Sequence, residues 1–180
     1  MTMTETLEQA GELKTYRTRT MIAAPIEVVW NTLVKTDEAL PFFFGGVCDT
    51  KDGLKPGAKM RMIHPSGKMV MVVGQVLVFD PPHRYSHTFQ MTNIDEPPAT
   101  ITYELNEIEG GTQFDLVIEN AVAGSKLEKQ MVGGQKYISQ NLKALVETGK
   151  PAFSGRMLML MSPLLPLFAP KGQRTRNWPL

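Results

Sequence analysis

The middle of the chain, residues 47 to 120, alternates between short strand patterns and short turns. Turn-forming stretches such as DGLKPG, DPPH and EGG separate runs in which apolar and polar residues alternate. Short turns between successive strands imply an antiparallel meander. We therefore predict strands over residues 47–50, 58–64, 68–79, 83–91, 99–108 and 112–120.

A long helix is predicted to follow this meander, from about residue 125 to residue 148. Gly149 suits its C-terminal cap, and Pro151 lies just beyond it. The helix carries one apolar stripe, made of Leu127, Met131, Ile138, Leu142 and Leu145. Alternation gives the strands one apolar face, made of Met60, Met62 and His64; Tyr85, His87, Phe89 and Met91; Ile101, Tyr103 and Leu105; and Phe114, Leu116, Ile118 and Asn120. The helix is the natural cover for that face.

The segment before the meander changes its period abruptly. The alternation of residues 14–23 gives way, after Pro25, to helical spacing up to about Val34. The stretch KTDEALPFFFGG predicts a second short helix that ends at Pro41, followed by an aromatic cluster and a glycine turn. We expect these two short helices to plug one end of the sheet and to help enclose a space beneath the long helix.

Composition and charge restrict the classes of protein. A chain of 180 residues with 42% hydrophobic and 21% charged residues is typical of one globular domain. The start has no secretory signal pattern and no apolar run is long enough to span a bilayer, so a cytoplasmic location is expected. The lone Cys48 excludes an internal disulfide. We predict a polar arm at 1–13, a domain at 14–149, and an apolar, basic extension at 150–180.

Five stretches together resemble a known superfamily. They are APIEVVW (24–30), GLKPGAKMRM (53–62), GQVLVFDPPHRYSHTF (74–89), GGTQFDLVIEN (110–120) and LKALVETG (142–149). Their order is similar to that of the START-like or SRPBCC superfamily, and most similar to the branch named for the activator of the heat-shock protein ATPase. The resemblance implies an α+β helix-grip fold, with a curved antiparallel sheet wrapped around a long C-terminal helix. Function stays open, because the superfamily includes lipid carriers, hormone receptors, polyketide cyclases, cochaperones and oxygenase domains.

Two departures from that pattern enlarge or re-line the expected interior. Phe89 stands where relatives usually have Trp, and Gly134-Gln135 stands where they often have Gly-Trp. We expect a cavity for a small hydrophobic molecule, although the same residues would also suit a solid core. The expected lining is Trp30, Phe42, Phe44, Met60, Met62, His64, Tyr85, Phe89, Met91, Phe114, Leu116, Asn120, Met131, Gln135 and Ile138. Twelve methionines favour an adaptable pocket.

The adjacent glycines Gly133 and Gly134 interrupt the apolar stripe of the long helix. Each glycine in a helix interior costs about 1 kcal/mol relative to alanine, so a compensating gain is expected. Either the backbone approaches a neighbour closely or kinks there, or the missing side chains leave room for a guest molecule.

Few residues of the sequence are candidates for catalysis or metal binding. His87 is the best candidate for a general acid or base, with Tyr103 as its partner, although a lone histidine on an apolar face is commonly a satisfied core residue. The histidines and Cys48 form no convincing zinc set, and no nucleophile elbow, phosphate loop or dinucleotide fingerprint is present. We expect no metal and no redox cofactor.

The extension at 150–180 has five of the 19 Lys and Arg residues and none of the 18 acidic residues, so it carries +5 and the rest −4. The rest therefore lacks the basic character typical of nucleic-acid binding. Pro163 and Pro166 prevent a long membrane-spanning helix. The extension is expected to pack on its own domain or on a second copy, to contact a membrane surface, or to cover the cavity. The sequence favours binding of a small hydrophobic ligand; the alternatives are a cyclase- or lyase-type enzyme and a protein-binding cochaperone.

Overall fold

The computed structural model describes residues 11–180, so most of the arm expected at 1–13 lies outside the described residues. Its eight strands form one sheet in the order β1-β8-β7-β6-β5-β4-β3-β2, and every neighbouring pair is antiparallel. The strands are β1 (Leu13–Ile22), β2 (Ala39–Leu40), β3 (Gly46–Asp49), β4 (Lys59–Ile63), β5 (Val70–Asp80), β6 (Arg84–Met91), β7 (Ala99–Ile108) and β8 (Gly111–Val122).

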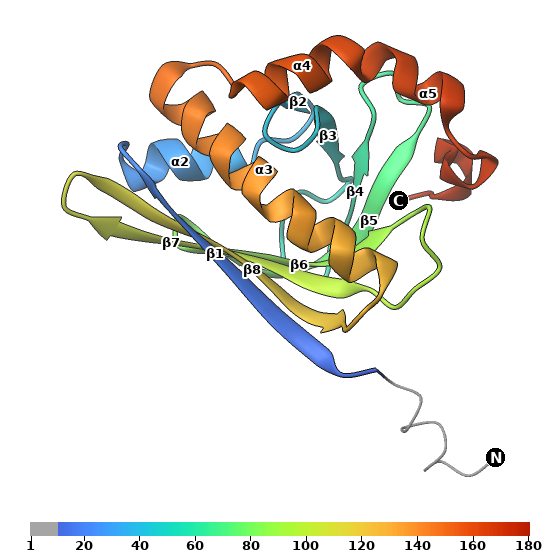
Figure 1. The fold of residues 1–180 in the computed structure, drawn as a ribbon, viewed down its shortest axis with the longest axis horizontal. Coiled ribbons are helices and arrows are strands. Elements are labelled where there is room, and N and C mark those ends of the chain that lie inside the picture. Colours follow the sequence, from blue (N-terminus) through green and yellow to red (C-terminus); the bar gives the residue numbers. More distant parts are fainter. Residues whose placement is uncertain (1–10) are drawn as a thin grey trace.

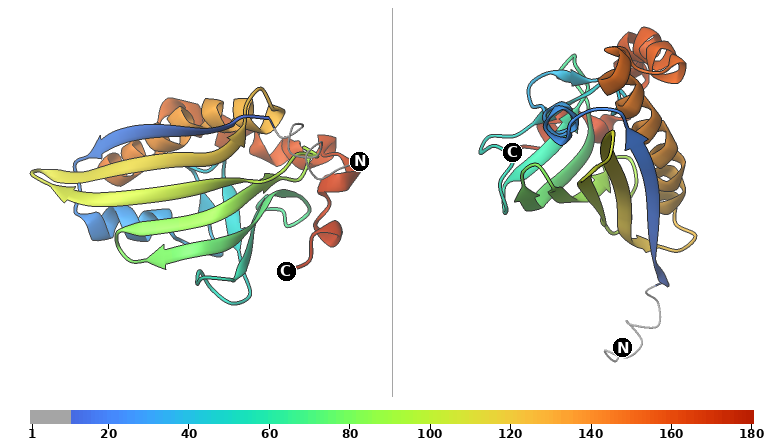
Figure 2. Two further views of the ribbon diagram at one scale, coloured as in Figure 1. Left: turned by 90° about the horizontal axis from the view of Figure 1, so that it is seen from below. Right: turned by 90° about the vertical axis from the view of Figure 1, so that its left-hand side faces the viewer.

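One long helix, α3 (Lys126–Thr148), covers the concave face of this curved sheet (Figure 1). The shorter helix α2 (Ile26–Leu33) lies at one end, where it buries Ile26, Val29, Trp30 and Leu33. Figure 2 shows the sheet curling around the interior, with β1 along one edge. The expected helix-grip fold is confirmed. The predicted strands and the helices α2 and α3 begin and end within two residues of their predicted bounds.

The second short helix predicted before Pro41 does not form. Residues 39–40 form β2, and a turn follows that carries the aromatic cluster. Asp37, within the predicted helix, has a left-handed φ of 64°, which a right-handed helix does not contain. Phe44 (φ 53°) and Gly45 (φ 71°) also have left-handed angles and shape the turn that follows β2. The end of the sheet is therefore closed by α2 together with this turn.

The N-terminus of α3 is held by side chains from two sources. Ser125 Oγ accepts a hydrogen bond from the Glu128 amide (2.9 Å), as an N-cap does. The Glu96 carboxylate, from the loop between β6 and β7, accepts from the amides of Lys126 (3.1 Å) and Leu127 (2.9 Å). These amide hydrogen bonds lower the pKa of Glu96. The helix ends at Gly149, whose φ is 72° and whose amide donates to the Leu145 carbonyl.

A bulge in β8 changes which side chains face the core. The pairing with β1 shifts between Lys14, opposite Ala121, and Tyr16, opposite Ile118. Asn120 has φ 60° and its side chain is exposed, whereas Ala121 is buried. An extra residue in one strand redirects its neighbours in this way, so the prediction that Asn120 points inward is wrong.

The core contains a polar cluster made of Tyr85, His87 and Tyr103. All three are buried, and their rings lie 5.1 to 6.0 Å apart. His87 Nδ1 pairs with the Thr88 carbonyl oxygen at 2.8 Å. Burial lowers the pKa of His87 to about 4 and raises the pKa of both tyrosines. His87 is therefore neutral at physiological pH.

The C-terminal extension packs along the outside of the domain as α4 (Phe153–Met161), a 3₁₀ turn η1 (Ser162–Leu164) and α5 (Leu165–Phe168), followed by the 3₁₀ turns η2 (Lys171–Gln173) and η3 (Thr175–Asn177). Pro163 and Pro166 divide the helical path rather than ending it, because Ser162, Leu164 and Leu165 keep right-handed helical angles. None of the helices within residues 11–180 has the length and apolarity needed to cross a membrane.

Replacing Gly155 with Ala tests the contact between α4 and α3. A Cβ at Gly155 would lie 2.1 Å from Oδ1 of Asn141, whereas one at Gly133 would meet nothing within 4 Å. We expect Gly155→Ala to lower the free energy of unfolding by about 1–3 kcal/mol. The control Gly133→Ala should raise it by up to about 1 kcal/mol, since alanine favours a helix. Urea unfolding followed by circular dichroism measures both, and equal effects would contradict this packing.

The buried imidazole of His87 predicts a specific pH dependence. Its folded pKa of about 4 lies below the ordinary 6.5, so between these values the unfolded chain binds a proton that the folded chain refuses. As pH falls through this window the protein should lose about 3 kcal/mol of stability from this group. The direct measurement is an NMR titration of the His87 ring, which should show no midpoint above about pH 5. A midpoint near the ordinary value would show that the ring is solvated.

Candidate functional site

A pocket of about 260 Å³ lies between α3 and the sheet. Strands β5 to β8 supply one wall, α3 supplies the other, and the turn after β2 and the 3₁₀ turn η2 complete it. The lining residues are Phe43, Phe44, Met71, Val72, Phe89, Met91, Asn93, Ile101, Leu116, Ile118, Gln130, Met131, Gly134, Gln135, Ile138 and Gln173.

The aromatic turn after β2 shapes one side of the pocket. Phe44 stacks on Tyr137 of α3, with ring centroids 4.4 Å apart and planes at 6°. Phe43 packs edge-on against Phe44 and Phe89, at 5.9 and 6.5 Å. These contacts fix both phenylalanines, so this wall is built by side chains of the turn that follows β2.

The two adjacent glycines of α3 have different surroundings. Gly134 lines the pocket, and a Cβ there would lie 3.6 Å from the Phe44 ring. A Cβ at Gly133 would meet nothing. The absence of a side chain at Gly134 therefore leaves space inside, whereas Gly133 contributes none.

The polar groups of the pocket are amides. Buried Gln135 donates through Nε2 to the carbonyl oxygens of Leu116 (3.2 Å) and Tyr16 (3.4 Å), and its own carbonyl oxygen accepts no hydrogen bond within the described residues. Asn93 and Gln130 are exposed and mark the mouth. Gln173, from the C-terminal extension, is buried and donates to Thr92 Oγ1 at 3.2 Å. Among the described residues, none that lines the pocket is charged.

The structure brings seven of the fifteen predicted lining residues to this pocket. They are Phe44, Phe89, Met91, Leu116, Met131, Gln135 and Ile138. Neither Phe43, one residue away from a predicted position, nor the loop residue Asn93 was predicted. Gln173 was missed because nothing in local sequence indicates that the extension reaches this mouth. Ile101 and Ile118 belong to the predicted apolar face and could have been included.

The other eight predicted residues lie elsewhere. Trp30, on α2, packs on Phe79 with ring centroids 5.4 Å apart. His64 uses its imidazole to hold the extension, since Nε2 lies 3.0 Å from the Ser162 carbonyl oxygen and Nδ1 2.9 Å from Ser66 Oγ. Asn120 is turned outward by the bulge. The remaining five, Phe42, Met60, Met62, Tyr85 and Phe114, are buried in the core outside the pocket.

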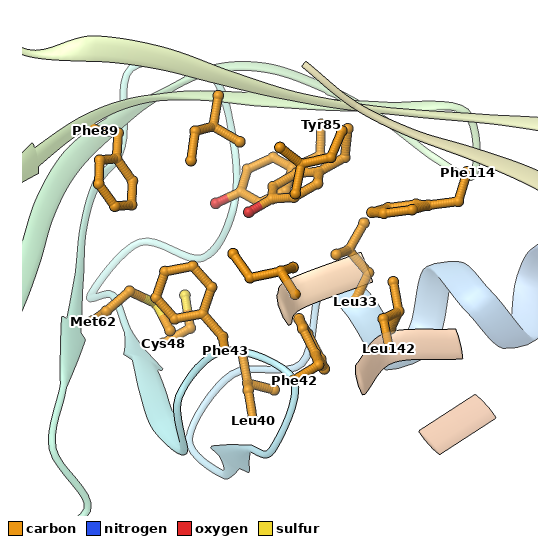
Figure 3. Packing of buried hydrophobic residues seen from close by; sticks show 14 of the residues in the cluster. Leu33, Leu40, Phe42, Phe43, Cys48, Met62, Tyr85, Phe89, Phe114 and Leu142 are labelled. Carbon is orange, nitrogen blue, oxygen red and sulfur yellow. The ribbon is translucent and has the colours of Figure 1, made fainter. Parts of the chain in front are cut away.

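His87 and Tyr103, the candidate acid and base, do not line the pocket. With Tyr85 they line a separate space of only about 20 Å³, and Phe43 is common to both linings. In Figure 3, Tyr85 faces Phe43 and Leu40 across the core, with Phe89 beside them. The Tyr85 hydroxyl is buried and has no hydrogen-bond partner among residues 11–180. Phe43 is therefore part of the wall of both spaces, and none of the three titratable side chains lines the pocket.

The part of the chain that the structure describes offers no group of three or more His, Cys, Asp or Glu side chains arranged to hold a metal ion. Cys48 is buried and its pKa is raised to about 12, chiefly by burial, so its thiol is protonated at physiological pH. A thiolate is the reactive form of cysteine.

Solved structures of known proteins share this fold. An HSP90 activator from Plasmodium falciparum is 22% identical, with a TM-score of 0.57 over 76% of this chain and 97% of its own. The Aha1 dimer from Colwellia psychrerythraea is 17% identical, with a TM-score of 0.60 over 76% and 98%. CalU16 from Micromonospora echinospora is also 17% identical, with a TM-score of 0.58 over 86% and 87%. At these identities the likeness establishes the fold alone.

A comparison with curated proteins gave no match. The sequence model described as "Activator of Hsp90 ATPase homolog 1-like protein" matches residues 23–147. This match covers β2 to β8, α2 and nearly all of α3, and it ends before α4. The resemblance seen in the sequence is thus confirmed, and the chain belongs to the family of activator of Hsp90 ATPase homolog 1-like proteins.

Proposed function

We propose that this protein binds a small, neutral, hydrophobic molecule in the pocket between the sheet and α3. The observation that carries the proposal is a space of about 260 Å³ whose lining is apolar apart from four amide side chains. Binding sites for small molecules have this composition, with an apolar wall and a few polar groups that orient the ligand.

The size of the pocket limits the ligand. An engineered apolar cavity of roughly 150 Å³ binds benzene, so a pocket of about 260 Å³ suits a molecule larger than one aromatic ring. A long acyl chain would have to extend through the mouth between Asn93 and Gln130.

The lining also limits the charge of the ligand. A carboxylate or phosphate buried here would meet no cation, and an unpaired buried charge is costly. The carbonyl oxygen of Gln135 instead offers an acceptor to a hydroxyl or amide of the ligand. A neutral molecule with one donor group therefore fits best.

Two other functions compete with this proposal. A cyclase- or lyase-type enzyme would need His87 or Tyr103 beside its substrate, but neither side chain lines the pocket. A cochaperone would bind its partner through the surface and would not depend on the pocket. The arrangement of the described residues favours ligand binding over both.

Filling the pocket from α3 should abolish binding. We expect Gly134→Trp to weaken binding of the neutral dye N-phenylnaphthylamine by at least about tenfold, because the indole would occupy apolar space that the dye needs. Gly133→Trp is the matched control, since its side chain would project away from all neighbours. Fluorescence titration measures both, with thermal unfolding as a check of folding. Equal affinities for the two variants would refute the proposed site.

The position of His87 outside the pocket gives a second test. His87→Gln should leave the dye affinity within about twofold of the parent protein, because His87 does not line the pocket. The substitution alters the buried cluster, so folding is again checked by thermal unfolding. A loss as large as that of Gly134→Trp in a folded variant would show that the two spaces are joined, and would favour the enzyme alternative.

A further inference from the structure

The C-terminal extension presents an outer apolar face to solvent. Its large side chains with 56% to 82% of their surface exposed are Phe153, Leu160, Met161, Leu164, Leu167 and Phe168. They lie on one side of the helical path formed by α4, η1 and α5, while Gly155 and Ser162 on the opposite side are buried. Exposed apolar patches of this kind mark interaction sites.

This face cannot turn inward, because its helical path is fixed to the domain at several points. His64 Nε2 lies 3.0 Å from the Ser162 carbonyl oxygen, and Gly155 packs directly against Asn141. Beyond α5, Met69 and Arg174 form an antiparallel bridge. Figure 1 shows α4 and α5 along the outside of the molecule, and Figure 2 shows them projecting beyond the sheet.

The charged side chains of the C-terminal extension all carry one sign. Residues 150–180 contain no Asp or Glu, and their cations make no ion pair with the described residues 11–180. The cations are Lys150, Arg156, Lys171, Arg174 and Arg176. An apolar helical face flanked by unpaired cations matches the surface of a bilayer that contains anionic lipids.

We propose that the outer apolar face docks the protein on an anionic membrane surface, with Leu and Phe side chains inserted and the cations at the headgroups. A second copy fits this face less well, because a symmetric contact would bring two +5 segments together. The proposal goes beyond ligand binding and does not depend on it. Docking would also place the mouth of the pocket near the membrane surface, because Gln173 of the docked extension lines the pocket.

Flotation with vesicles tests this proposal directly. The full chain is mixed with vesicles of phosphatidylcholine alone, or of phosphatidylcholine with phosphatidylglycerol. We expect binding to the anionic vesicles to exceed binding to neutral ones by at least about tenfold, and to fall with added salt. The triple variant Leu160→Gln/Leu167→Gln/Phe168→Gln should lower anionic-vesicle binding by at least about tenfold.

The matched control replaces three exposed apolar residues elsewhere, as Met21→Gln/Val28→Gln/Leu77→Gln, and should bind vesicles as the parent does. The proposal is overturned if the parent protein binds neither vesicle, or if both triple variants lose binding equally. It is also overturned if sedimentation velocity shows a dimer that only Leu160→Gln/Leu167→Gln/Phe168→Gln dissociates. Dye affinity, measured on the same proteins, reports separately on the pocket.

Discussion

The structure depends on one packing relation, the burial of a single helix against a sheet much wider than itself. The concave face of eight strands requires an apolar cover, and α3 is the only long helix among the described residues that lies on it. Contacts between α3 and the sheet concentrate on β1 and β8. The interior farther along the sheet, toward β5 and β6, must be filled by something else, and this is where the pocket lies.

Three additional pieces complete that interior, and each has a separate structural cause. α2 and the turn after β2 close one end. Phe44 and Gly45 have left-handed backbone angles in this turn, and aromatic contacts hold Phe43 and Phe44. Glu96 and Ser125 fix the start of α3 through its free amide groups. The extension adds Gln173 at the mouth. The pocket is the space that these pieces leave unfilled, and Gly134 is the position on α3 where a side chain would close it.

Much of the fold could be predicted from sequence, because strand alternation and helical spacing are local properties. The sheet, α2 and α3 follow directly from those periods, and Gly149 marks the end of α3 by a conformation that favours glycine. The site was predictable only in part. A bulge turns the Asn120 side chain outward, and the left-handed angle of Asp37 is incompatible with the helix predicted before Pro41. Local patterns carry neither signal, and no pattern indicates that His64 binds the extension rather than a ligand.

Ligand binding requires that the space between Phe44, Phe89 and Met131 is apolar and empty of protein atoms. A crystal structure of the protein under xenon pressure tests this most directly, because xenon enters dry apolar cavities and scatters X-rays strongly. Xenon density is expected in contact with these three side chains, and none is expected in the small space beside Tyr85. A structure in which rearranged side chains fill the region, with no xenon bound there, would contradict the proposed site.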